Sequence, residues 1–236
     1  MTAHSDGTTV VGHAYYHDAM FVGHVGAGLA AKRWAPRLSL GVLFLAAMWL
    51  DAVLWVFVLL GLEMVHVPAD FQENHYLTFT FPYSHGLVAS LGWSAAALAV
   101  ARACGWSASA GLVVAATVFS HFILDAVVHV VGLPVLGSGS YRLGLGLWRH
   151  TGLELALEGL IGALGWWIYV GSPGSARGAA RWGLGAIVTL CALLTAMGAL
   201  ATGPPPSVTA MAWVSLATIV ILSLLAAWLD RRRSSF

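Results

Sequence analysis

Long apolar segments alternate with short polar or turn-rich segments along almost the whole chain. A helix needs roughly 20 apolar residues to cross the hydrocarbon core of a bilayer. Segments of this kind predict six transmembrane helices, at about residues 39–62, 86–104, 108–131, 151–171, 183–202 and 208–229. The separating segments are rich in turn residues, as in TGPPPS before the last predicted span. The pattern therefore predicts an all-α integral membrane protein.

The residues before the first predicted span follow another pattern. The apolar part of MFVGHVGAGLAAKRWAPR is too short to cross the membrane comfortably, so we expect an N-terminal amphipathic (interfacial) or re-entrant helix. A crossing by residues 10–31 would raise the number of spans to seven. We expect one transmembrane helical domain over residues 1–236, made of a cytoplasmic or interfacial segment (1–38), a metal-site core (39–171) and two C-terminal spans (183–229).

Composition agrees with a membrane protein, because 59% of the residues are hydrophobic and only 9% are charged, against about 25% charged in soluble domains. Lys and Arg accumulate on cytoplasmic loops. With the N-terminus inside, nine of the eleven basic residues lie inside, and only Arg142 and Arg149 lie outside. We therefore expect a multi-pass protein of the cell (inner or plasma) membrane with both termini in the cytoplasm. The net charge of +1 offers no footprint for nucleic acid.

Polar residues recur at helical spacing inside two apolar segments. In SHFILDAVVH, at about 100° per residue, His121, Asp125 and His129 share one face of a helix. HTGLELALE repeats this spacing with His150, Glu154 and Glu158. A lone His in a span also occurs as a hydrogen-bonding residue between helices, so the combination of His and carboxylate is what indicates a functional site.

Two further polar residues belong to this pattern. Asp51 lies at the centre of the first predicted span, where an Asp costs on the order of 2.5–3.5 kcal/mol and tends to mark function. His85 opens the second span from the outer side. We expect these residues to converge on one polar pocket in the outer half of the bilayer. A buried carboxylate needs a cation, and the predicted spans hold no Lys or Arg except Arg102 at one end, so a divalent metal or protonation of the carboxylates is required.

The ligand types restrict the metal. The chain has two cysteines, both within apolar segments, so the donors are imidazole and carboxylate. Such donors suit zinc, with iron or manganese as alternatives. His121 and Asp125 reach one ion from a single helix, and His85 completes a three-ligand site with a position left for water. Haem ligation by paired His is a lesser alternative.

These motifs resemble, in chain order, a family of membrane-bound metal-dependent hydrolases called YdjM-like. The resemblance covers about residues 20–170 and rests on GHVGAGLAAK, the Asp of the first span, YSHGL and SHFILDAVVH followed by GLPVL. It implies that His24, Asp51, His85, His121 and Asp125 form the metal site. The pattern is also distantly similar to zinc-dependent phospholipases C. This chain departs from it in carrying a single acidic residue in WLDAV, Gly86 after the motif His, and HVVG where close relatives read HRPD.

Two functions follow from these residues. The first is a metal-dependent hydrolase of a lipid-like or amphipathic ester or phosphoester, in which Asp51 or Glu158 acts as general base or binds a second ion. The second is a non-catalytic protein that binds a metal or a proton, as a transporter or as an accessory subunit of a larger membrane complex. HVVG at residues 129–132 favours the second function slightly.

Overall fold

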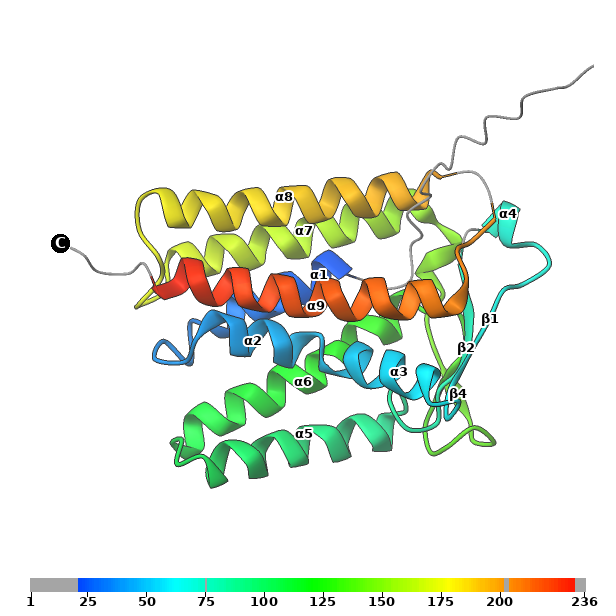
Figure 1. Ribbon diagram of the computed structural model, residues 1–236, viewed down its shortest axis with the longest axis horizontal. Coiled ribbons are helices and arrows are strands. Elements are labelled where there is room, and N and C mark those ends of the chain that lie inside the picture. The colour runs from blue at the N-terminus through cyan, green and yellow to red at the C-terminus, as the bar shows by residue number, and fades with distance from the viewer. Residues whose placement is uncertain (1–20, 75, 202–203, 232–236) are drawn as a thin grey trace, which may run out of the picture.

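The computed structural model describes residues 21–74, 76–201 and 204–231. Helices make up most of this part of the chain, and strands are few and short (Figure 1). The helices are α1 (Phe21–Ala31), α2 (Leu40–Ala47), α3 (Trp49–Leu59), α4 (Phe71–Asn74), α5 (Leu87–Ala103), α6 (Ala108–Val128), α7 (Thr151–Val170), α8 (Ala179–Ala199) and α9 (Val208–Arg231), with a 3-10 helix η1 (Leu147–Arg149). The strands are β1 (Met64–His66), β2 (Thr78–Thr80), β3 (Leu133–Pro134) and β4 (Arg142–Leu143).

Four helices of the described chain, α6 to α9, are long and apolar enough to cross a membrane. A fifth candidate is the pair α2 and α3, which is bent by 56° at Met48 and passes the same test only as a broken span. Helices α1 and α5 are apolar but shorter, with 11 and 17 residues. The prediction of a helical membrane protein is therefore confirmed in outline, whereas the number of six spans is not.

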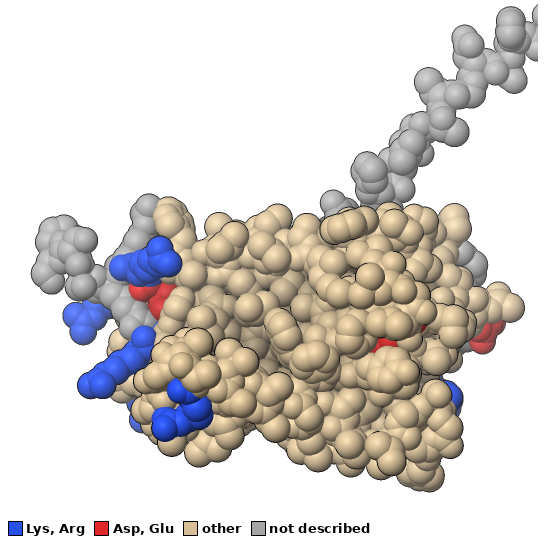
Figure 2. Space-filling model, turned by 60° about the horizontal axis from the view of Figure 1, so that its bottom comes forward, with Lys and Arg blue, Asp and Glu red and all other residues tan. Residues whose placement is uncertain are grey.

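The long helices run roughly along one axis, and the connections gather at its two ends (Figure 1). One end carries the α1–α2, α5–α6 and α7–α8 connections and the end of α9. The other end carries α4 and two antiparallel hairpins, β1–β2 and β3–β4. Lys and Arg side chains gather at the first of these ends (Figure 2), which we call the basic end. The described basic residues there are Lys32, Arg33, Arg37, Arg102, Arg177, Arg181 and Arg231.

Most of helix α1 is enclosed by the bundle, and only Phe21, Ala27 and Ala30 are partly exposed. Its buried residues include Val22, Val25 and Leu29, each with no exposed area. An interfacial amphipathic helix would leave one whole face exposed, and residues 21–31 do not show such a face; the re-entrant alternative stays a prediction. With 11 residues, α1 is too short to cross on its own. Residues 1–20, with His13 and His17, lie outside the described residues.

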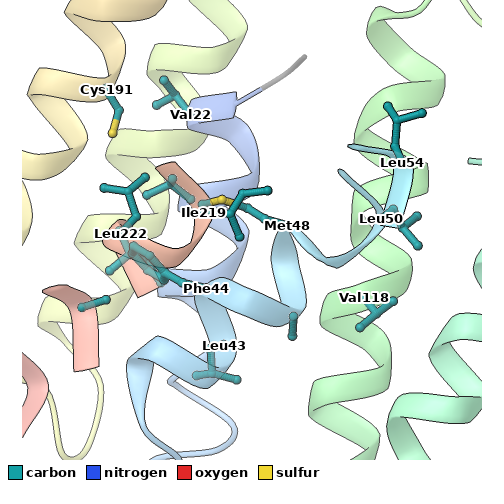
Figure 3. Close-up of a cluster of buried hydrophobic side chains, with 14 of the residues drawn as sticks. Val22, Leu43, Phe44, Met48, Leu50, Leu54, Val118, Cys191, Ile219 and Leu222 are labelled. Carbon is teal, nitrogen blue, oxygen red and sulfur yellow. The ribbon is translucent and has the colours of Figure 1, made fainter. Parts of the chain in front are cut away.

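Small residues let α1 approach α7 closely. A Cβ added to Gly165 would lie 2.2 Å from the backbone oxygen of Gly26, and one added to Gly26 would lie 2.5 Å from that of Ile161. Glycines at such positions allow helix backbones in membranes to pack against each other. On the other side, Figure 3 shows apolar residues of α2 and α9, among them Phe44 and Leu222, packed into one cluster. These contacts fix α1 between α7 and the helices that carry the polar residues.

Candidate metal centre

Six polar residues that are far apart in the sequence converge inside the bundle. His24 comes from α1, Asp51 from α3 and His85 from the residue before the N-cap of α5. Helix α6 contributes His121 and Asp125, and its C-cap residue is His129. Every one of them is buried. Asp51 has the most exposed side chain of the six, at 11%. Their convergence agrees with the predicted pocket, although His24 lies outside the predicted core segment 39–171.

Four of these side chains meet at the Nε2 atoms of His85 and His121. The Nε2 atoms of His85 and His121 are 3.2 Å apart. Asp51 Oδ1 lies 3.4 Å from Nε2 of His85 and 3.5 Å from Nε2 of His121. Asp125 Oδ2 lies 3.4 Å and 3.3 Å from the same two nitrogens. Two imidazole nitrogens and two carboxylate oxygens therefore face one another.

The backbone of the bent helix pair fixes His121. Its Nδ1 lies 2.7 Å from the carbonyl oxygen of Ala47, the last residue of α2. A carbonyl only accepts hydrogen bonds, so Nδ1 carries the proton and donates it. In the neutral ring Nε2 is then bare, and its lone pair faces the centre. The bend at Met48 thus places a carbonyl where it orients this ring.

A series of side-chain hydrogen bonds fixes the orientation and tautomer of His85 in the same way. Ser84 Oγ donates to Glu63 Oε2 at 2.7 Å, and His85 Nδ1 lies 2.8 Å from the same Oγ. Because the single hydroxyl proton is directed to the carboxylate, Oγ accepts from His85 Nδ1. Nε2 of His85 is therefore also bare and directed to the centre.

The distances from these two nitrogens to their neighbours are in the range that metal ligands show. Two unprotonated nitrogens 3.2 Å apart repel each other unless a metal ion or a proton lies between them. With metal–ligand bonds of about 2.0–2.1 Å, the ligands of a tetrahedral site are about 3.3–3.4 Å apart. The five separations that involve these nitrogens run from 3.2 to 3.5 Å. Imidazole and carboxylate without thiolate are donors that suit zinc, iron or manganese.

Asp125 also faces a third imidazole with its other oxygen. His24 Nε2 lies 3.3 Å from Asp125 Oδ1, so the two oxygens of Asp125 face different sides. Neither ring nitrogen of His24 nor this oxygen has a hydrogen-bond partner within the described chain. His129 Nε2 is more distant, at 3.8 Å from Oδ2. Two overlapping groups of residues, which share His121, could each hold a metal ion. They are His24 with His121 and Asp125, and Asp51 with His85 and His121.

Aromatic rings cover the centre on the side of the hairpins. Phe81, the residue after β2, packs on two histidines. Its ring centroid lies 5.2 Å from that of His85 and 5.9 Å from that of His129. The ring centroid of Trp148, in η1, lies 3.9 Å from the ring centroid of His129. These rings exclude water from the two histidines, which strengthens electrostatic interactions in the centre.

The predicted base Glu158 is buried in α7 and accepts a hydrogen bond from the backbone N–H of Val22 at 2.7 Å. A carboxylate at this place caps the first turn of α1 and is favoured by the helix dipole. Glu154, of the same repeated spacing, is also buried. The structure thus gives Glu158 a structural role beside His24, and its role in catalysis remains a prediction.

The sequence interpretation missed two groups of residues. Glu63 and Ser84 were not singled out; the only signal was a carboxylate at the end of a predicted span and a hydroxyl directly before His85. It also missed a buried ion pair at the basic end, between Lys32 Nζ and Asp230 Oδ2 at 2.8 Å.

Comparisons of the chain with protein-family models, with curated proteins and with solved structures find no match. The case for a function therefore depends on the geometry of the centre.

Proposed function

We propose that this protein is a membrane-embedded, metal-dependent hydrolase, with zinc as the metal, and that it belongs with the YdjM-like proteins that its motifs resemble. The observation that carries the proposal is the pair of bare Nε2 atoms of His85 and His121, facing each other beside two carboxylates. Asp125 has both oxygens directed at imidazoles and is 1% exposed, so a cation is the natural counter-charge.

The roles of the residues follow from their positions. His85, His121 and Asp125 would hold the ion, and zinc bound there would lower the pKa of a water ligand toward about 7. Asp51 has the most exposed side chain of these four, and its Oδ1 lies 3.4 and 3.5 Å from the two nitrogens, so it would be placed to accept a proton from that water.

The surroundings of the centre favour a lipid-like ester or phosphoester as the substrate. A groove of about 430 Å³ lies between α1 and α6, with Ala27 and Ala30 on one wall and Ala116 and Ser120 on the other. Its lining is almost wholly apolar, and Ser120 directly precedes His121. An acyl chain can lie in such a groove while the polar part of the molecule approaches the centre from the membrane.

We also propose an orientation. The basic end faces the cytoplasmic side of the cell membrane, because Lys and Arg favour that side. The centre is near the opposite end of α6, and hence in the outer half of the membrane. The six spans of this topology are the bent pair α2–α3, α5 and the four long helices, and they place Arg231 on the cytoplasmic side.

A second candidate is a non-catalytic metal-binding protein, either a transporter or an accessory subunit. The observation in its favour is the number of buried imidazole and carboxylate donors that converge, because these can close a structural site, whereas catalytic zinc keeps one position open. His24, His121 and Asp125 are at most 1% exposed, which also suits a closed site.

Elemental analysis and hydrolysis assays test the proposal together. We expect the detergent-purified protein to contain close to one equivalent of zinc, iron or manganese, and His121→Ala and Asp125→Ala to lose it. Thr117→Ala, one turn away on α6, serves as the control that keeps the metal. Metal-dependent cleavage of fluorogenic lipid esters or phosphoesters supports the hydrolase. Bound metal without turnover supports the second candidate, and metal retained in both variants contradicts the centre itself.

A further inference from the structure

Glu63, in the loop after α3, links that loop to the segment directly before α5. Its side chain is buried, with 1% of the residue exposed. Oε1 accepts from the backbone N–H groups of Tyr83 and Ser84, both at 2.9 Å. Oε2 accepts from Ser84 Oγ at 2.7 Å, and that hydroxyl contacts His85 Nδ1 at 2.8 Å. Both oxygens of this carboxylate are thus used to hold the segment that ends at His85.

The direction of these hydrogen bonds is set by the carboxylate. An ionised carboxylate can only accept, so it takes the proton of Ser84, and Ser84 Oγ can then only accept from His85. The proton of the His85 ring is consequently held on Nδ1. Groups behind a metal-binding histidine commonly fix its tautomer and orientation in this way.

We propose that Glu63 is a positioning residue of the metal centre, which acts through Ser84 to keep Nε2 of His85 free of a proton and available to the metal. The proposal rests on the proposed metal site for its effect on affinity. Its effect on the tautomer of His85 does not depend on metal being bound.

His121 provides an internal comparison. Its Nδ1 donates to the Ala47 carbonyl, which no substitution at Glu63 changes. A variant of Glu63 should therefore alter the proton position on one histidine of the pair and leave the other as it is. A general disturbance of the fold would alter both.

Glu63→Gln is the informative substitution. Its amide oxygen can still accept from the two backbone N–H groups, while its NH2 group now donates to Ser84 Oγ. The hydroxyl proton of Ser84 is then directed to His85 Nδ1, and the ring proton moves to Nε2, where the metal should bind. We expect the tautomer of His85 to switch, and zinc affinity to fall about 10- to 100-fold, the usual effect of losing such a partner.

Nitrogen-15 NMR of histidine-labelled, metal-free protein reports which ring nitrogen carries the proton, with His85→Asn used to assign the signals. Zinc affinity is measured on the same samples by competition with a chelator. Ser84→Ala, which removes the hydroxyl without altering the carboxylate, should leave His85 without its Nδ1 acceptor and give a mixture of tautomers. Ser94→Ala is the matched control, because this buried hydroxyl of α5 bonds only to the Ser90 carbonyl in the described chain.

The outcomes separate the two proposals. A switched tautomer at His85 alone, together with weaker zinc binding, supports the role of Glu63. An unchanged Nδ1–H tautomer in Glu63→Gln, or unchanged zinc affinity despite a switch, overturns it. Wild-type protein that binds no zinc overturns the metal site, while the NMR result still decides what Glu63 does to His85. If Glu63→Gln does not fold, Ser84→Ala decides the question by the same two measurements.

Discussion

His24 lies flat on His121, with ring centroids 3.7 Å apart and ring planes within 7° of parallel. The two rings come from α1 and α6, and neither has any exposed area. The stack leaves His24 Nε2 beside Asp125 Oδ1 and covers one face of the ring that is directed at the metal position. His24 therefore acts on the centre both through its shape and through its nitrogen.

Substitutions at His24 should separate these two effects. His24→Phe keeps a flat ring on His121 and removes the nitrogen that faces Asp125, so we expect thermal stability to be retained and zinc affinity to fall about 10-fold. His24→Leu also removes the stack and should lower both. Thermal unfolding and chelator competition check this, and zinc affinity in His24→Phe equal to that of wild type would contradict a role for the nitrogen.

Asp51→Asn should keep the metal and lose hydrolysis. The other three donors remain in place, so the ion is still bound, but an amide cannot accept the proton of a metal-bound water. We expect the rate of ester or phosphoester cleavage to fall about 10²- to 10⁴-fold. Glu73→Gln, an exposed acidic residue of α4, is the control. Full activity of Asp51→Asn would mean that the base is elsewhere, with Glu158 the next residue to test.

Gly165→Ala should destabilise the bundle. Its Cβ would lie 2.2 Å from the backbone oxygen of Gly26, so α1 and α7 would have to separate. Overpacking of this kind typically costs about 1–3 kcal/mol, and the shift should also displace His24. Gly159→Ala on the same helix is the matched control, because a Cβ there meets nothing within 4 Å. Equal thermal stability of the two variants would show that this contact is looser than described.

Breaking the Lys32–Asp230 pair from one side should be strongly destabilising. Lys32→Met leaves a buried carboxylate that has lost its cation, and removal of one partner of a buried pair costs about 3–5 kcal/mol. Asp230 also accepts from Leu40 N–H at 2.9 Å, a bond that Asp230→Asn can retain through its amide oxygen. The double variant Lys32→Met/Asp230→Asn should therefore recover part of the loss in unfolding experiments. Arg33→Met, on the exposed neighbour, should be close to neutral.

The apolar segments of the sequence predicted where helices would form, because their length and composition depend only on neighbouring residues. The bend at Met48 was not predicted, since neither Pro nor Gly marks it in LFLAAMWLDAV. The close approach of α2 to α9 was not predicted either; a Cβ on Gly41 would lie 2.3 Å from the Ser223 backbone oxygen. Helix α5 (Leu87–Ala103) agrees with the predicted span 86–104 to within one residue at each end.

The face shared by His121 and Asp125 was predictable from helical spacing, as was a contribution from Asp51. The partners of Glu63 were not, because they come from a turn some twenty residues away and from backbone N–H groups that have no signature in the sequence. The position of Glu158 beside Val22 likewise depends on how α1 enters the bundle.

The bend between α2 and α3 makes the centre and the shape of this span interdependent. Inside a membrane a released carbonyl must find a donor, and the Ala47 carbonyl finds it in the same imidazole whose other nitrogen faces the metal position. Turning that ring away from the centre would therefore strand a backbone oxygen in an apolar environment. The helix break thus holds the His121 ring in the orientation that directs Nε2 at His85, Asp51 and Asp125, whether or not a metal ion is bound.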